Sequence, residues 1–402
     1  MPSTLPEGDP VPADGSLPES AVAELADATL SFYLHVPFCR SRCGYCDFNT
    51  YTAAELGGGG SRQEWADTAI AELALAERVL SSTPAVSTVF VGGGTPTLLP
   101  PADLARVLAA IRERFGLAAH AEVTTESNPD TVTAQDLHEM RAAGFTRISF
   151  GMQSGDAEVL QILDREHTTG RAQQAVAEAR AAGFESVSLD LIYGTPGESQ
   201  ESWARTLESA LEAEPDHVSA YALIVEPGTR LAARMARGEL PEPDDDDLAD
   251  KYLLTEEVLS AAGFGWYEVS NWARTPADRC RHNLAYWRGG NWWGIGPGAH
   301  SHVGGVRFWN VKHPTAWAGR LAGGESPGYA QEVLDAETRR IERVLLELRL
   351  ADGLPLGVLT DTERARLAGP VAEGLVTLQH ERVVLTLRGR LLADGVVRDL
   401  LD

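Results

Sequence analysis

Short apolar runs alternate with stretches of helical periodicity between residues 30 and 240. The runs that predict strands are Ser31–Val36, Val86–Val91, Val123–Thr125, Arg147–Phe150, Ser186–Ile192 and His217–Leu223. Apolar residues at helical spacing follow most of these runs, as in Trp65–Leu80. Because strands that alternate with helices form parallel βαβ units, the pattern predicts an α/β fold whose six units make an open, partial (β/α)6 barrel.

The sequence Ala-Ala-Gly-Phe recurs at 142–145, 181–184 and 261–264, each time between a helical pattern and a strand-like run. Glycine adopts the left-handed conformation that ends many helices, and the phenylalanine can pack back onto the helix. We interpret these segments as repeated helix-to-strand joints, and not as a solenoid repeat.

The barrel is expected to span residues 30–240. Residues 1–29 are rich in Pro, Asp, Glu, Ser and Ala, which predicts a disordered or loosely packed leader. Residues 241–328 are expected to form a linker and a Trp/Gly-rich segment. Residues 329–402 predict a small winged-helix-like α+β domain, with an amphipathic helix followed by a hairpin and further helices.

Composition restricts the possible partners. The 402 residues include 34 basic and 58 acidic side chains, a net charge of −24, which argues against nucleic acid as the main partner. No apolar run is long enough to predict a membrane-spanning helix, and the N-terminus lacks the basic start of a secretory signal. Four cysteines in a chain without targeting signals predict a cytoplasmic protein.

Three of the four cysteines, Cys39, Cys43 and Cys46, lie within eight residues with the spacing Cys-x3-Cys-x2-Cys. Zinc usually takes four ligands in two separated pairs, and this chain offers no second pair. Three thiolates can instead hold three corners of a [4Fe–4S] cluster and leave the fourth iron open. The alternative is a set of free cysteines in a reducing compartment.

Polar residues lie at the ends of the predicted strands, where parallel β/α barrels place their active sites. Gly92–Gly94 leaves backbone N–H groups accessible to a ligand, and Glu126 can accept hydrogen bonds from an ammonium group or a ribose. Asp190 lies in an apolar strand and is costly to bury without a partner. Arg165 can pair with a carboxylate, although a surface ion pair is an equally simple interpretation.

The cysteine spacing, with Tyr45 directly before Cys46, resembles the radical S-adenosylmethionine (SAM) superfamily, and beyond the leader the chain resembles its HemW/HemN branch. This resemblance implies a [4Fe–4S] cluster on Cys39, Cys43 and Cys46 and SAM at the open iron. The SAM-binding residues that it implies are Tyr33, Tyr45, Gly93, Gly94, Thr95, Glu126, Gln153, Arg165, Asp190 and Ala222.

A second segment, Cys280-Arg-His-Asn-Leu-Ala-Tyr-Trp287, resembles the HemW-type motif linked to heme binding. A neutral His282 can be an axial ligand of heme iron, and His300 and His302 are rival ligands. The predicted heme-binding residues are Cys280, His282, Asn283, Tyr286 and Trp287, with Trp292 and Trp293 as further flat apolar surfaces. The alternative is that these side chains pack the core.

Two functions follow from the resemblance. The first is a heme chaperone that binds the cluster, SAM and heme and passes heme to an acceptor protein. The second is an oxygen-independent coproporphyrinogen III oxidase, the radical SAM enzyme of porphyrin biosynthesis. These oxidases carry a further cysteine two residues after the third, where this chain has Phe48, so the sequence favours the chaperone and leaves enzymatic activity uncertain. A third, weaker possibility is a radical SAM methyltransferase. This sequence has neither the extra cysteines nor the nucleic-acid-binding surface expected of such an enzyme.

Overall fold

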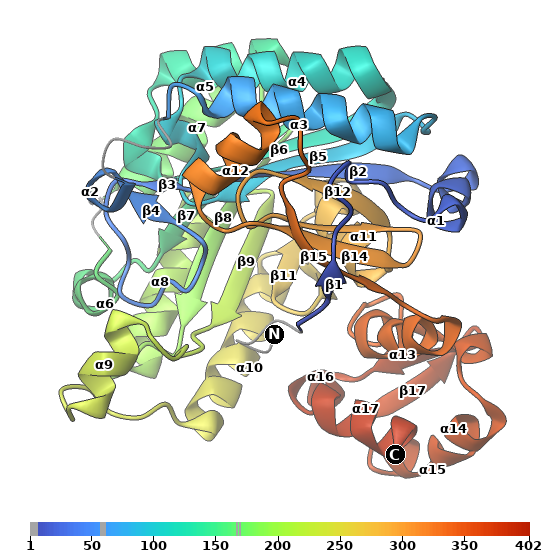
Figure 1. Cartoon of the computed structure of the whole chain (residues 1–402). Coiled ribbons are helices and arrows are strands. Elements are labelled where there is room, and N and C mark those ends of the chain that lie inside the picture. Colours follow the sequence, from blue (N-terminus) through green and yellow to red (C-terminus); the bar gives the residue numbers. More distant parts are fainter. Residues whose placement is uncertain (1–6, 57–61, 166–167, 169) are drawn as a thin grey trace.

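The computed structural model describes residues 7–56, 62–165, 168 and 170–402. Within this part of the chain, one 13-stranded sheet runs in the order β1-β15-β14-β13-β12-β2-β5-β6-β7-β8-β9-β11-β10. Its centre is parallel and both of its flanks are antiparallel. The sheet does not close on itself, so the predicted partial barrel is confirmed (Figure 1).

The six predicted strands form the parallel centre. They are β2 (Leu30–Val36), β5 (Val86–Gly93), β6 (Leu117–Ser127), β7 (Arg147–Gln153), β8 (Ser186–Tyr193) and β9 (His217–Ala222). The helices that connect them are α3 (Trp65–Leu80), α4 (Pro101–Phe115), α5 (Ala134–Ala143), α6 (Ala157–Ile162), α7 (Arg171–Ala182) and α8 (Gln200–Glu212). Figure 1 shows α3, α4 and α5 side by side over one side of the sheet, as βαβ crossovers require.

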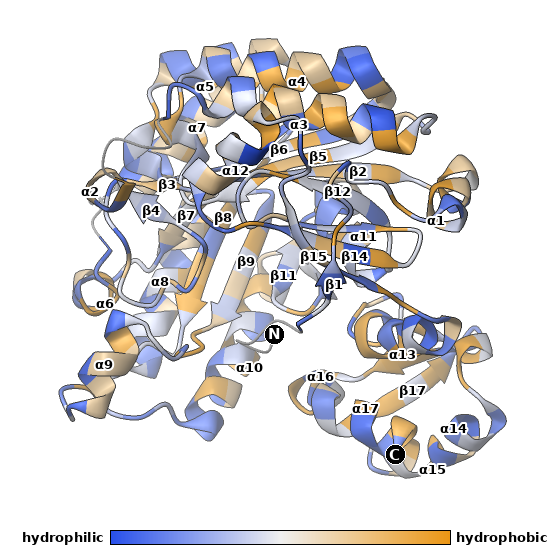
Figure 2. Cartoon of the chain, in the orientation of Figure 1, coloured by the Kyte–Doolittle hydropathy of each residue, from blue (hydrophilic) through white to orange (hydrophobic). Residues whose placement is uncertain are grey.

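Side chains alternate across the parallel strands, because successive residues of a strand point to opposite faces. On β2, Phe32 and Leu34 are fully buried under the helices. Tyr33 and His35 point to the other face, toward the barrel interior, and pair in register with Phe90 and Gly92 of β5. Figure 2 shows hydrophilic and hydrophobic residues alternating along the ribbons of α3 and α4, as expected for helices that pack one face on a sheet.

The Ala-Ala-Gly-Phe joints are confirmed as helix ends. Gly144 after α5 has φ +114° and Gly183 after α7 has φ +90°, so both adopt the left-handed conformation. Gly263, which follows α10 (Asp245–Ala261), has φ +86°. A side chain at these positions would strain the backbone, which explains the repeated glycine.

Residues 241–328 are not a linker. After α9 (Arg230–Ala236) and α10, the strands β10 (Gly265–Glu268) and β11 (Asn271–Ala273) extend the sheet beside β9. Helix α11 (Arg281–Trp287) follows, and then β12 (Asn291–Ile295) pairs parallel to β2 at the other side. The sheet continues through β13 (His300–Val303) and β14 (Val306–Asn310), with α12 (Pro314–Ala322) leading to β15 (Gly328–Val333).

The expectation of a loosely packed leader is wrong for the residues from Glu7 onward; residues 1–6 lie outside the described part. Strand β1 (Asp9–Pro10) pairs with β15, and α1 (Glu19–Ala23) and the 3-10 helix η1 (Glu24–Asp27) follow it. Ala21 and Leu25 are almost completely buried in the main core. A few apolar residues among many polar ones were enough to dock this segment, which composition alone does not indicate.

The small C-terminal α+β domain is confirmed, although β15 belongs to the main sheet, so the domain starts a few residues later than predicted. It contains α13 (Ala336–Glu347), β16 (Leu354–Pro355), α14 (Asp361–Arg366), α15 (Ala368–Ala372), β17 (Val376–Gln379), β18 (Arg382–Leu385), α16 (Leu387–Leu391) and α17 (Ala393–Leu401). Its own core includes Val344, Val383 and Val396, and Figure 1 shows it beside the barrel. Among the described helices, none has the length and apolar character needed to span a bilayer.

Glu72 of α3 connects this helix by hydrogen bonds to the turn after β12, to β14 and to α12. Its buried carboxyl accepts hydrogen bonds from Gly296 N at 2.8 Å, Asn310 Nδ2 at 2.7 Å and Trp317 Nε1 at 2.7 Å. Burial raises the pKa of Glu72 to about 7. One side chain therefore satisfies three buried donors from β14, α12 and the turn.

We predict that Glu72→Ala lowers the free energy of unfolding by about 3 kcal/mol, because three buried donors lose their acceptor. Urea unfolding measures the change. The matched control is Glu77→Ala on the same helix, which removes a surface ion pair with Arg114 and should cost less than about 1 kcal/mol. Equal losses in the two variants would contradict the role given to Glu72.

Candidate functional site

The three neighbouring cysteines lie at the carboxyl ends of the barrel strands. Cys39 ends the short strand β3 (Phe38–Cys39), and Cys43 and Cys46 follow in the loop before β4 (Tyr51–Thr52). All three are free thiols and partly exposed. Gly94 lies directly against this loop, since a Cβ there would come 3.0 Å from Cys39 Sγ. The loop is therefore accessible to solvent and packed against the glycine turn that follows β5.

The surroundings of the thiols suit a multi-iron group. Burial raises the pKa of the Cys39 thiol, and it raises the pKa of Cys46 to about 11, so ionised thiolates need a cation beside them. In the described part of the chain, no three His, Cys, Asp or Glu side chains converge on a single-ion site. A [4Fe–4S] cluster bonds each thiolate to a different iron, so its ligands need not meet at one point.

The glycine turn after β5 permits a close approach of its backbone. Gly93 has φ +110°, and a Cβ on it would lie 2.6 Å from the His35 ring. Its N–H donates to Glu126 Oε2 at 3.1 Å. The next residues are fixed to the cysteine loop, because Thr95 N donates to Phe38 O at 2.8 Å. Gly93, Gly94, Thr95 and Glu126, predicted from separate strands, thus lie together.

Glu126 and Asp190 form a pair of carboxyls inside the barrel mouth. Burial raises the pKa of Glu126 to about 8, and the negative charge of Asp190 adds to the shift. Burial also raises the pKa of Asp190, against the effect of Ser149 Oγ, which donates to both of its carboxylate oxygens at 2.8 and 2.9 Å. A cationic group bound between them would remove the cost of ionising both.

Arg165 connects this region to the cysteine loop. Its Nη1 donates to Cys43 Sγ at 3.6 Å and its Nη2 to Gly151 O at 2.9 Å. Its buried Nε has no partner among the described residues. Gln153 nearby has φ +65°, a left-handed conformation that is strained for a residue other than glycine and is often kept for function.

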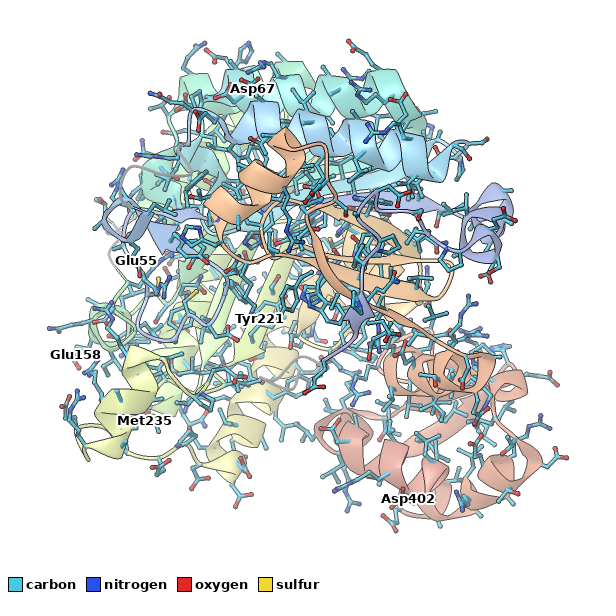
Figure 3. All side chains as sticks on the ribbon, in the orientation of Figure 1. Glu55, Asp67, Glu158, Tyr221, Met235 and Asp402 are labelled. Carbon is cyan, nitrogen blue, oxygen red and sulfur yellow. The ribbon has the colours of Figure 1, made fainter. Side chains whose placement is uncertain are left out.

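The remaining predicted SAM residues surround the same mouth. The Tyr33 hydroxyl and His35 Nδ1 share a hydrogen bond of 3.0 Å, and burial raises the pKa of the Tyr33 phenol. Tyr45, in the cysteine loop, packs against the apolar cluster under the loop. Ala222 ends β9, directly after Tyr221, which Figure 3 labels near the middle of the view.

The cysteine loop is also fastened to the sheet extension. Asn49 Nδ2 donates to Pro297 O at 3.0 Å and to Lys312 O at 2.8 Å. His35 Nε2 bonds to Asn49 O at 2.9 Å. Through Asn49, the loop that carries the thiols is joined both to β2 and to the two turns that flank β13 and β14.

The predicted heme segment lies at the opposite end of the barrel interior. The N-terminus of α11 is held by Glu122, whose carboxylate accepts from the backbone N of Arg281 at 2.9 Å and of His282 at 3.0 Å. His282 is 1% exposed; its Nδ1 bonds to Thr88 Oγ1 at 2.7 Å and its Nε2 to Tyr286 Oη at 2.9 Å. Burial lowers the pKa of His282 to about 3, so its ring is neutral.

The other residues of this segment pack around His282. Cys280 is 2% exposed, with its Sγ 3.7 Å from Glu122 Oε1. Tyr286 contacts the Trp292 ring edge-on, with centroids 4.5 Å apart. Hydrogen bonds from Trp287 and Asn283 lower the pKa of Glu268 against the larger effect of its burial. Helix α11 thus fills the amino-terminal end of the barrel.

The comparisons with known proteins agree with this geometry. Residues 33–210 match the model of the radical SAM superfamily. The chain is 54% identical to a protein named heme chaperone HemW from Mycobacterium tuberculosis over 94% of this chain and 97% of that one. It is 34% identical to the heme chaperone HemW of Escherichia coli over 92% and 97%. The solved structure of coproporphyrinogen III oxidase (HemN) from Escherichia coli superposes with a TM-score of 0.81 and 25% identity, covering 98% and 96%.

The fold and the three-cysteine loop are those of the radical SAM superfamily, and the chain belongs to it. Its similarity to the curated relatives extends over nearly their whole length. Within the superfamily, the chain is a member of the HemW family.

Several residues of the site were not predicted from the sequence. His35 and Ser149 are the clearest, because they bond to Tyr33 and Asp190. His35 lies two residues after Tyr33, on the same face of β2, so the alternation of the strand contained a signal for it. Asn49 and Glu122 act through contacts with segments distant in sequence, which no local pattern reveals.

We predict that the SAM-free protein loses stability as the pH rises from about 5 to about 8. Folded Glu126, with its pKa raised to about 8, keeps a proton that the unfolded chain releases near the ordinary glutamate pKa of 4.5. Glu126→Gln should remove up to about 3 kcal/mol of this dependence. Urea unfolding at about pH 5, 6, 7 and 8 measures it. The same slope in both proteins would show that Glu126 ionises normally in the fold.

Proposed function

We propose that the chain is a heme chaperone, which binds a [4Fe–4S] cluster, SAM and heme and passes heme to an acceptor protein in the cytoplasm. The observation that supports this proposal most strongly is the 54% identity to a HemW heme chaperone over nearly the full length of both chains. The three-cysteine loop beside the buried carboxyl pair supports the cofactor part.

The proposed roles of the residues at the barrel mouth follow from their contacts. Cys39, Cys43 and Cys46 hold the cluster, which together with SAM supplies one-electron cleavage chemistry when bound. Arg165 provides a positive charge beside Cys43, and its unpaired Nε is available to a carboxylate of SAM. Glu126 and Asp190 balance the charge of its ammonium group or bind its ribose, while Gly93 lets the ligand approach the backbone.

The proposed heme-binding part of the chain is the segment from α11 to β13. It includes the predicted residues Cys280, His282, Asn283, Tyr286 and Trp287, and the neighbouring Trp292 and Trp293. For His282 to bind iron, its hydrogen bond to Tyr286 has to break and solvent-side access has to open. The rival ligand His300 belongs to the same segment and is exposed, so it needs no such opening.

A second candidate function is the decarboxylation of coproporphyrinogen III, favoured by the full-length structural similarity to HemN. Phe48 argues against it. This side chain is 63% exposed in the cysteine loop, at the position where the oxidases are expected to carry a further cysteine.

One anaerobic experiment separates the two functions. Protein reconstituted with iron and sulfide is titrated with heme and, separately, incubated with coproporphyrinogen III, SAM and a reductant. We expect stoichiometric heme binding, transfer of that heme to an acceptor apoprotein, and no protoporphyrinogen. Turnover to protoporphyrinogen without heme binding would establish the oxidase function instead.

We predict that replacing Cys39, Cys43 or Cys46 by Ala abolishes the visible absorbance of the reconstituted cluster, because each thiolate is proposed to hold a different iron. Cys280→Ser is the matched control, since this buried thiol lies at the other end of the barrel and should leave the iron content unchanged. A full complement of iron in all three alanine variants would refute the ligand assignment.

A further inference from the structure

The interior face of the barrel does not end at β2. In register, Tyr33 of β2 pairs with Gly294 of β12, and His300 of β13 pairs with Trp309 of β14. Gly294 lies so close to β13 that a Cβ on it would come 2.2 Å from His300 O. The His300 backbone fills the space that a side chain at 294 would take, so β13 packs closely against β12, and His300 is separated from Tyr33, at the proposed SAM site, by β12 alone.

His300 differs from the other histidines of this sheet. Both ring nitrogens of His35, His217 and His282 have hydrogen-bond partners, and Nδ1 of His302 bonds to Gly290 O. His300 is exposed, and within the described residues its ring nitrogens have no partner. Its ring stacks on the buried Trp309, with centroids 5.8 Å apart and an interplanar angle of 18°, which supports the imidazole from one side.

The charges around His300 suit an anionic planar ligand. Partial burial lowers its pKa, and the positive charges of Lys312 and Arg307 lower it further, so the imidazole is neutral at pH 7. Arg307 is already paired with Glu332 and Glu342. Lys312 is exposed, and its ammonium group forms no ion pair in the described part of the chain. The site therefore offers one accessible imidazole and one available cation.

We propose that His300 is the iron ligand of the carried heme and that Lys312 binds a heme propionate. This inference rests on the proposed heme-carrier function and assigns the ligand to the exposed histidine, while His282 is a positioning residue that holds α11 inside the barrel. A ligand on an exposed face can release heme to a partner without opening the core, which a carrier requires.

The test is a heme titration of the anaerobically reconstituted full-length protein, followed by absorbance in the Soret region. His300→Ala should shift the Soret band and weaken heme binding at least about tenfold. Free imidazole should restore the wild-type spectrum, because it replaces a lost ligand but not a lost structural contact. His138→Ala, at an exposed position on the distant helix α5, is the matched control and should behave as wild type.

Lys312→Gln should weaken heme binding several-fold but leave the binding of heme dimethyl ester, which lacks charged propionates, unchanged. The iron content of both variants should equal that of wild type, because neither side chain contacts the thiols. A wild-type spectrum and affinity in His300→Ala would overturn the assignment. Absence of heme binding by the wild-type protein would instead defeat the heme-carrier function, so the two failures are distinguishable.

Discussion

The alternation of side chains along parallel strands is the constraint on which the rest of this structure depends. Each barrel strand buries apolar residues under the helices, as Phe32 and Leu34 do, and must direct the intervening positions inward. Those inward positions are polar in this chain, with Tyr33, Glu126 and Asp190 among them. Buried polar groups need partners, so hydrogen bonds connect most of the side chains inside the barrel.

The two ends of the barrel interior differ in how their polar groups are paired. At the amino-terminal end, α11 supplies its own partners: Glu122 caps the helix and His282 bonds to both Thr88 and Tyr286. At the carboxyl end, burial and the charge of Asp190 raise the pKa of Glu126, and Arg165 Nε has no hydrogen-bond partner among the described residues. The amino-terminal end is filled by α11, and the carboxyl end places Glu126 and Arg165 where a cofactor could compensate them.

Local sequence patterns predicted the parallel centre of the sheet and the glycine joints, because side-chain periodicity and helix ends are determined by neighbouring residues. They also predicted that the cysteines, Gly93 and Glu126 lie at the carboxyl end of the barrel, because all parallel strands of a barrel run in the same direction. They did not predict that β12 pairs with β2 or that residues 7–28 dock on the sheet, because such pairings join segments hundreds of residues apart. For the same reason, the motif around His282 did not reveal that its ring is buried while that of His300 is exposed.

Asn49 connects the cysteine loop to the β13–β14 part of the sheet. Its side chain and backbone join the thiol-bearing loop to Pro297, Lys312 and His35, so ordering one of these segments lowers the entropic cost of ordering the others. For the proposed cluster at the thiols and the proposed heme at the β13–β14 face, thermodynamic linkage makes such an effect mutual, so each would change the affinity for the other by the same factor. Under the proposed function, the affinity for heme therefore depends on whether the iron–sulfur cluster has been assembled.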